Sequence, residues 1–137
     1  ITKEKGGIPF PNKVSFISQN WKKYPALIQD STLVTKIIDI EKTINGRAYY
    51  YIPKEKVLPF AGQIKTGDII LITTKKKGLD TAHVGIAIEN EGQIYLLHAS
   101  VSDKKVSVTT ETLPDYLQRI TSHSGIMIGR LINFKSN

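Results

Sequence analysis

Two of the three histidines, His83 and His98, lie on either side of the turn Asn90-Glu91-Gly92. The residues around the turn are β-prone, so the segment is typical of a β-hairpin. A two-residue loop would pair Asn90 with Gln93 and place the two histidines diagonally on one face of the hairpin. Two imidazoles in contact can perform acid–base chemistry, because one ring shuttles a proton near neutral pH while the other orients it.

The register of this hairpin stays open at the level of sequence. A three-residue loop would place His98 on the opposite face from His83. The two-residue loop separates apolar from polar side chains more cleanly, so we favour it. The simpler alternative is two unrelated strand histidines. No metal site and no cofactor is expected, because no third ligand follows at a recognisable spacing.

The third histidine, His123, lies in the polar run from Thr121 to Gly125. Serine, threonine and glycine cluster in turns, so we expect His123 to be a solvated loop residue before a last strand.

The favoured register also predicts how the two hairpin faces differ. Val84, Ile86 and Ile88 would form a continuous apolar face, and the histidines would share the other face with Gly85 and Ala87. Because the small residues make the histidine face shallow, we expect it to be incomplete. It would be exposed as a patch or covered by a segment from elsewhere.

The elements that must position these histidines follow from periodicity and turn residues. An irregular opening segment is expected around Pro9 and Pro11, then a short amphipathic stretch over 14–21. Asp30 or Ser31 would cap a helix that ends at Gly46. A further short helix is expected over 113–120. Strands are expected over residues 47–52, 68–74, 82–89, 93–99, 105–110 and 126–134.

These elements predict an α+β fold, with N-terminal helices followed by an antiparallel β-meander, because the connections between strands are too short for parallel crossovers. The 137 residues suffice for a single domain, residues 1–137. No apolar run reaches the ~18 residues that a membrane-spanning helix needs.

The chain carries 19 Lys and Arg against 12 Asp and Glu, a net charge of +7. Such a charge is compatible with a polyanionic partner. The basic residues are scattered, however, and no zinc-finger or RNA-binding motif is present, so we expect no nucleic-acid partner. The one basic run, Lys75-Lys76-Lys77, precedes Gly78 and is typical of a solvated hairpin tip.

Several segments of the sequence resemble motifs of the NlpC-type cell-wall peptidases. Lys65-Thr66-Gly67-Asp68-Ile69-Ile70 resembles their Gly-Asp strand opening. His83-Val84-Gly85-Ile86 resembles the strand of their catalytic histidine, and Leu97-His98-Ala99-Ser100 resembles the strand that follows it. Over nearly the whole chain, the sequence is similar to one branch of that superfamily, the N-acetylmuramoyl-L-alanine amidase-like family.

This resemblance implies a papain-like, α+β domain that hydrolyses amide bonds of bacterial peptidoglycan. In that mechanism a cysteine attacks the carbonyl carbon, and a histidine takes and returns the proton. Carried over by motif, His83 is the catalytic base and acid, and His98 orients it. The expected partner is a peptidoglycan fragment or stem peptide, and the expected location is the cell envelope, periplasmic or extracellular.

The sequence departs from the family pattern at the nucleophile, because it contains no cysteine. The hydroxyl residues Ser15, Ser18 and Ser31 show no nucleophile-elbow pattern. One explanation is that these residues are the C-terminal part of a longer domain whose cysteine-bearing segment lies elsewhere. The alternative is a non-catalytic module that has lost the cysteine and binds peptidoglycan or a partner protein.

Three further residues are candidates for contact with the substrate. Tyr49 and Tyr51 could stack on sugar faces in a groove, although aromatic side chains at strand spacing more often pack in a core. Ser100 follows the second histidine in the motif. The sequence does not indicate which amide bond is cleaved, nor the oligomeric state.

Overall fold

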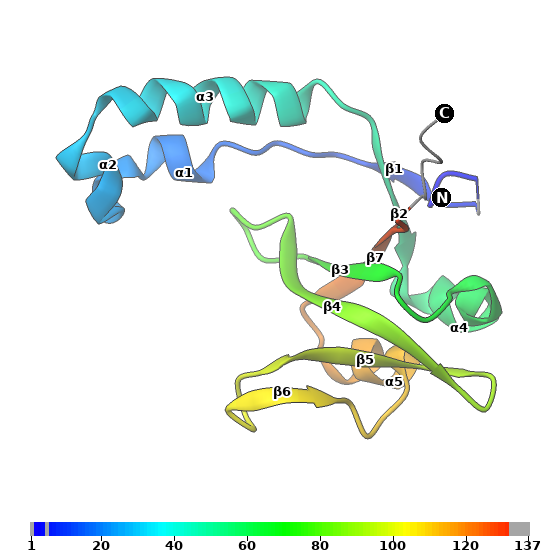
Figure 1. Cartoon of the computed structure of the whole chain (residues 1–137). Helices are drawn as coiled ribbons and strands as arrows, with labels where there is room; N and C mark the ends of the chain where they lie inside the picture. The colour runs from blue at the N-terminus through cyan, green and yellow to red at the C-terminus, as the bar shows by residue number, and fades with distance from the viewer. Residues whose placement is uncertain (1, 5, 132–137) are drawn as a thin grey trace, which may run out of the picture.

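The computed structural model describes residues 2–4 and 6–131 and contains one seven-stranded sheet in this part of the chain (Figure 1). The strand order is β1-β2-β7-β3-β4-β5-β6, and every pair of neighbours is antiparallel. The strands are β1 (Ile8–Phe10), β2 (Tyr49–Pro53), β3 (Ile69–Thr74), β4 (Thr81–Asn90), β5 (Gln93–Ser100), β6 (Lys105–Val108) and β7 (His123–Gly129). The mixed class of helices and antiparallel sheet is as expected.

The sheet is not a simple meander. Strands β3 to β6 run as consecutive hairpins, as predicted, but β7 returns to the middle of the sheet between β2 and β3. The opening segment, expected to be irregular, contributes the edge strand β1, which pairs Ile8 with Tyr51. An edge strand tolerates Pro9, because one side of it needs no partner for its backbone. The expected last strand lies outside the described residues from residue 132 onward.

Eight short helical segments connect and cover the strands within the described residues. The N-terminal ones are α1 (Phe16–Gln19), the 3₁₀ turn η1 (Trp21–Lys23), α2 (Pro25–Gln29) and α3 (Thr32–Asn45). After β2 come η2 (Lys54–Lys56), α4 (Val57–Phe60) and η3 (Ala61–Gln63), and α5 (Leu113–Arg119) precedes β7. Of the helices in the described part of the chain, none combines the length and apolarity required to cross a membrane.

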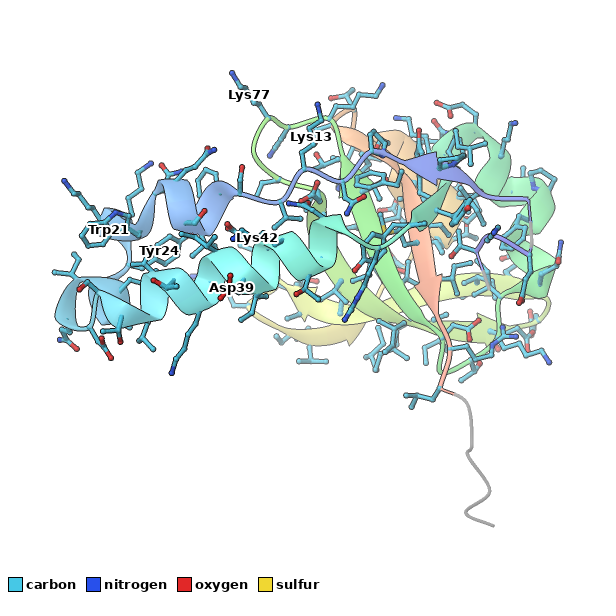
Figure 2. All side chains as sticks on the ribbon, turned by 90° about the horizontal axis from the view of Figure 1, so that it is seen from above. Lys13, Trp21, Tyr24, Asp39, Lys42 and Lys77 are labelled. Atoms are coloured by element: carbon cyan, nitrogen blue, oxygen red, sulfur yellow. The ribbon has the colours of Figure 1, made fainter. Side chains whose placement is uncertain are left out.

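The longest helix begins and ends as its sequence predicts. The Asp30 carboxylate accepts hydrogen bonds from the backbone N–H and the hydroxyl of Thr32, at 3.0 and 2.6 Å. The helix ends at Asn45, and the N–H of Gly46 closes its last turn on the carbonyl of Lys42. Helix α3 and its neighbours α1 and α2 form an arm whose far end carries Trp21 and Tyr24, away from the strands (Figure 2).

The hydrophobic core lies on the histidine face of the sheet. Helices α4 and α5 lie on this side (Figure 1) and contribute Val57, Leu113 and Leu117, all fully buried. They pack with strand residues such as Leu96 and Ile72, also fully buried. The expectation that this face would be incomplete is therefore wrong over most of its area.

The small residues of the histidine face leave space in which larger side chains can pack. A Cβ on Gly85 would lie 2.6 Å from Cδ1 of Leu96, so glycine leaves room for the leucine side chain to lie across β4. The opposite, outer face carries the aliphatic residues that we expected to be the continuous apolar face, and it is open. Val84 is 52% exposed and Val106 is 70% exposed.

An ion pair links the start of β3 to the chain after β7. The Asp68 carboxylate, in a residue only 1% exposed, accepts hydrogen bonds from Nε and Nη2 of Arg130, at 2.6 and 2.5 Å. It also accepts one from the N–H of Lys65 at 2.9 Å. Burial alone would raise the pKa of Asp68, but these bonds and the positive charges of Arg130 and Lys65 hold it below its ordinary value. The turn that opens β3 is thereby tied to the end of the neighbouring strand β7.

Candidate functional site

His83 on β4 and His98 on β5 are in direct contact. Their atoms Nε2 and Nδ1 lie 2.7 Å apart, and the two rings stand nearly perpendicular at 88°. The register is the two-residue loop that the sequence favours, with Asn90 opposite Gln93 and positive φ angles at Glu91 and Gly92. The predicted histidine pair on one face of the hairpin is confirmed.

The contact determines which nitrogen of His83 is available for chemistry. When Nε2 of His83 donates its proton to Nδ1 of His98, Nδ1 of His83 carries the free lone pair. Burial lowers the pKa of His83, and the neighbouring His98 lowers it further, so the ring is neutral at pH 7. A neutral, oriented imidazole with a free nitrogen can accept a proton from a thiol or from water.

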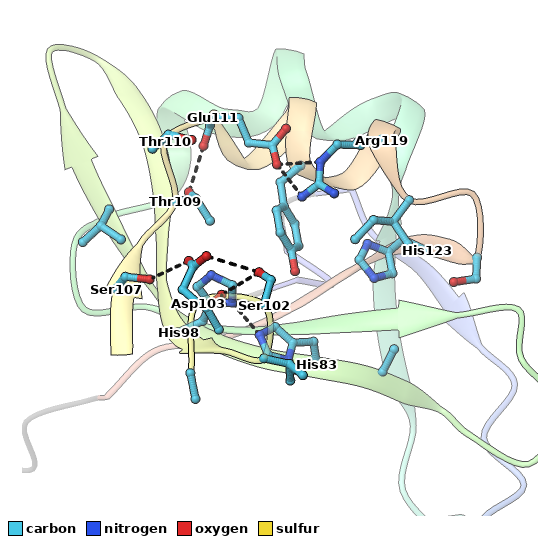
Figure 3. Close-up of a pocket in the computed structure, with 18 of the residues that line it drawn as sticks. His83, His98, Ser102, Asp103, Ser107, Thr109, Thr110, Glu111, Arg119 and His123 are labelled. Carbon is cyan, nitrogen blue, oxygen red and sulfur yellow. Dashed lines mark hydrogen bonds and ion pairs between the residues drawn. The ribbon is translucent and has the colours of Figure 1, made fainter. Parts of the chain in front are cut away.

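The histidine pair forms part of the floor of a cavity of about 580 Å³, open to solvent (Figure 3). Strand β5 and the loop after it supply one wall, and α5 supplies the opposite wall. Hydroxyl side chains dominate the polar lining, from Ser100, Ser102, Ser107, Thr109, Thr110 and Ser122. The volume suits a ligand of the size of a short peptide or a small glycopeptide.

His123 also lines this cavity, contrary to the expectation of a solvated loop residue. It begins β7 opposite Thr74, and its side chain is only 4% exposed. A β-bulge explains why His123 faces the cavity rather than solvent. Gly125 pairs with Thr73 but His123 pairs with Thr74, so Ser124 is the extra residue. The bulge turns His123 onto the histidine face, a role that bulges commonly have near functional sites.

Tyr116 of α5 lies between two of the histidines. Its ring centroid is 5.7 Å from that of His98, edge to face, and 5.7 Å from that of His123. The Arg119 guanidinium lies 5.2 Å from the centre of the Tyr116 ring and forms an ion pair with Glu111 at 2.6 Å. Burial raises the pKa of Tyr116, so its phenol stays protonated and can donate a hydrogen bond.

Sequence reasoning missed both Tyr116 and His123. Only their residue types indicate a possible role in the site. Tyr116 lies on an ordinary amphipathic helix. Regular alternation along β7 predicts that Ser124, not His123, lies on the same face as Ile126. In the described part of the chain, no three His, Asp or Glu side chains come together as they would around a metal ion.

The predicted substrate residues divide into two groups. Ser100 lines the cavity beside the histidines, and its Oγ accepts a hydrogen bond from the N–H of Asp103 at 3.2 Å. Tyr49 and Tyr51 lie on β2, where Tyr51 packs against Phe10 of β1 with ring centroids 5.4 Å apart. The structure does not bring these two tyrosines to the histidine pair. The three lysines 75–77 lie in the exposed loop between β3 and β4, as predicted, and Lys77 projects outward (Figure 2).

Comparison with known proteins identifies the family. The chain matches the family described as AmiA-like, N-acetylmuramoyl-L-alanine amidase-like, over residues 1–126. A crystal structure of an N-acetylmuramoyl-L-alanine amidase from Bacteroides uniformis is similar, with 36% identity and a TM-score of 0.78, covering 90% of this chain and 53% of that one. No curated protein sequence gave a match.

A Bacteroides fragilis protein, named only provisionally as a xylanase, shares 35% identity and a TM-score of 0.80, over 93% of this chain and 56% of that chain. The chain thus spans about half the length of the structures that it matches. The family match covers almost all of the sequence, including the hairpin with both histidines. The chain therefore belongs to the N-acetylmuramoyl-L-alanine amidase-like family.

Proposed function

We propose that this chain is the histidine-bearing part of a cysteine-type hydrolase that cleaves amide bonds of peptidoglycan. The observation that carries the proposal is the 2.7 Å contact between His83 and His98 on the floor of an open cavity. That contact leaves one imidazole nitrogen free and fixes the ring that bears it. Membership of the amidase-like family supports peptidoglycan as the substrate.

The nucleophile of this reaction is a cysteine thiol outside residues 1–137, in an NlpC-type, papain-like domain of which this chain is the C-terminal part. Nδ1 of His83 takes the thiol proton, and the thiolate attacks the amide carbonyl carbon. The protonated His83 then gives the proton to the leaving nitrogen as the carbon–nitrogen bond breaks. Water, deprotonated by the same ring, releases the acid product and the thiol. His98 keeps the free nitrogen of His83 directed at the reacting atoms.

The second candidate is a module that binds peptidoglycan, or a partner protein, without cleaving it. One observation favours it, namely that the 137 residues contain no cysteine. The two candidates differ in what the full-length reading frame encodes. A cysteine at the start of a predicted helix elsewhere in that frame supports hydrolysis, whereas its absence supports binding alone.

Both candidates place the protein in the cell envelope, periplasmic or extracellular, because that is where peptidoglycan is accessible. Cell fractionation followed by immunodetection tests this location. Detection only in the cytoplasmic fraction would contradict it.

The decisive experiment is digestion of purified peptidoglycan by the full-length protein, with mass spectrometry of the products. We expect amide cleavage that a thiol-alkylating reagent abolishes. The products identify the bond, either the one that joins muramic acid to the stem peptide or one within the peptide. Cleavage that survives alkylation would exclude the cysteine mechanism. No cleavage by the intact protein, together with retained binding, would favour the second candidate.

A further inference from the structure

Two side chains that the hydrolytic mechanism leaves unused, Tyr116 and His123, meet in the cavity beside the histidine pair. They come from α5 and from the bulged start of β7, and their ring centroids lie 5.7 Å apart with the planes tilted by 34°. Tyr116 is 9% exposed and His123 is 4% exposed, and both line the cavity. His123 faces the same space as His83 and His98 (Figure 3).

Tyr116 presents a hydrogen-bond donor with no partner. None of the hydrogen bonds among the described residues involves its phenol, whereas the exposed Tyr95 phenol bonds to Gln93 Oε1 at 2.9 Å. Its ring is held from two sides, by His98 and by the guanidinium of Arg119. Glu111 in turn fixes Arg119. A buried phenol pinned in this way keeps its O–H direction, which suits recognition of a ligand.

His123 presents a second donor, because its tautomer is constrained. Nδ1 is buried and has no hydrogen-bond partner among the described residues. A buried N–H without an acceptor is rarer and costs more free energy than a buried acceptor without a donor. The proton of the neutral ring therefore belongs on Nε2. Burial lowers the pKa of His123, and electrostatic interaction with His83, Lys54, Lys76 and Arg119 lowers it further, so the ring is neutral. Nε2–H is then the polar group that His123 offers to the cavity.

We propose that the Tyr116 hydroxyl and His123 Nε2–H together bind one oxygen acceptor of the substrate, a carbonyl or carboxylate oxygen of the peptide, and so determine which substrates the histidine pair receives. This inference rests on the proposed function and deepens it. Both groups touch the substrate but neither exchanges a proton with it. The Arg119–Glu111 pair acts only through Tyr116, as a positioning element.

The test uses the full-length protein and defined muropeptides. Tyr116→Phe removes one oxygen atom and keeps the ring, and His123→Leu removes the donor. Each substitution should raise KM five- to tenfold, the loss expected for one hydrogen bond to a ligand, while kcat stays within about twofold. His123→Gln places an amide N–H near the position of Nε2 and should restore most of the affinity. Tyr95→Phe, on the same strand as His98 but on the outer face, is the matched control and should change nothing.

Two muropeptides that differ only in whether their carboxyl groups are amidated separate the two sources of oxygen. A carboxylate acceptor predicts weaker binding of the amidated peptide, and Tyr116→Phe should erase that preference. A carbonyl acceptor predicts that Tyr116→Phe weakens both peptides equally.

Unchanged KM in both Tyr116→Phe and His123→Leu would overturn the acceptor site, and so would an equal loss in Tyr95→Phe. If the unsubstituted protein does not cleave the muropeptides, the hydrolytic proposal fails, and calorimetric binding by the same variants decides the acceptor site separately. Five- to tenfold weaker binding in the two variants would then support it, and unchanged binding would exclude it.

Discussion

At the scale of single residues, the proposed mechanism assigns different roles to the two paired histidines. Nδ1 of His98 lies 2.7 Å from Nε2 of His83, and in the proposed mechanism His98 orients the ring while the free nitrogen of His83 exchanges the proton. A catalytic base is harder to replace than the group that orients it, since the orienting group only raises the population of the productive ring position. The two histidines should therefore respond differently to substitution.

In the full-length protein, His83→Ala should lower kcat by about 10²–10⁴, the range that general acid–base catalysis supplies, with a further loss from the missing thiolate activation. His98→Ala should cost less. His98→Asn should retain more activity than alanine, because its amide oxygen can occupy the place of Nδ1 and accept the same hydrogen bond. Steady-state kinetics on muropeptides measures all three. An equal loss in His83→Ala and His98→Ala would contradict this division of labour.

The pKa shifts of His83 and His123 predict how stability depends on pH. Both are lowered from the ordinary value of 6.5, chiefly by burial. The unfolded chain therefore takes up protons first as the pH falls below about 6.5. The free energy of unfolding should be largest above that pH and decrease from there towards pH 5. The slope contributed by one fully shifted group approaches about 1.4 kcal/mol per pH unit within this window.

Urea unfolding between pH 8 and pH 5 measures this dependence. His123→Gln removes one of the two groups and should flatten the curve. Asp68 does not affect the curve between pH 8 and pH 5, because its pKa is lowered from 3.8. Its contribution to the free energy of unfolding is lost only at more acidic pH. Stability that stays constant or rises on acidification would contradict neutral, buried histidines.

At the scale of elements, the Asp68–Arg130 pair connects the turn before β3 with the end of β7. The Asp68 side chain is almost fully buried, and Arg130 is its only cationic hydrogen-bond donor among the described residues. Loss of the guanidinium leaves a buried carboxylate with the Lys65 N–H. Such a carboxylate is costly to keep away from water.

Arg130→Gln should therefore lower the free energy of unfolding by about 1.5–3 kcal/mol, the contribution of hydrogen bonds to a charged group. Arg119→Gln is the matched control. Its ion pair with Glu111 is more exposed, with the arginine side chain at 58%, so Arg119→Gln should lower the free energy of unfolding by clearly less than Arg130→Gln. Chemical denaturation at pH 7 compares the two. Equal losses would show that the burial of Asp68 is not what makes its pair important.

At the scale of the whole molecule, the two faces of the sheet differ in how they are covered. Helices α4 and α5 close the histidine face, whereas the outer face leaves large aliphatic side chains open to solvent. Val84, Ile86, Val106 and Val108 are between 42% and 70% exposed. An apolar surface of this kind promotes association or binding of apolar dyes.

The 137-residue chain should accordingly bind an apolar fluorescent dye and self-associate. Val84→Lys together with Val106→Lys should reduce both effects while changing the free energy of unfolding by less than about 1 kcal/mol, because each site is more than half exposed. Ala87→Lys, on the same strand as Val84 but fully buried, should unfold the protein. Light scattering and dye fluorescence are the measurements. Undiminished association in the double variant would show that the outer face of the sheet is not the surface through which the chain associates.

The sequence by itself determined what depends on neighbours along the chain. The start of the long helix at Asp30-Ser31, the stop at Gly46 and the hairpin that joins His83 to His98 are all set by a few adjacent residues, and each agrees with the prediction. Turn chemistry and side-chain alternation act over such short distances, so they can be recognised without knowledge of the rest of the molecule.

Only the tertiary structure decided where β7 lies, which face of the sheet is buried, and that His123 and Tyr116 join the site. Strand β7 is drawn to the centre of the sheet because Ile126 and Ile128 are buried there, beside β3. His123 reaches the cavity only through the bulge at Ser124, which arises from pairing with a strand some fifty residues away. Contacts between residues so far apart in the sequence depend on the tertiary fold, and local sequence patterns do not predict them.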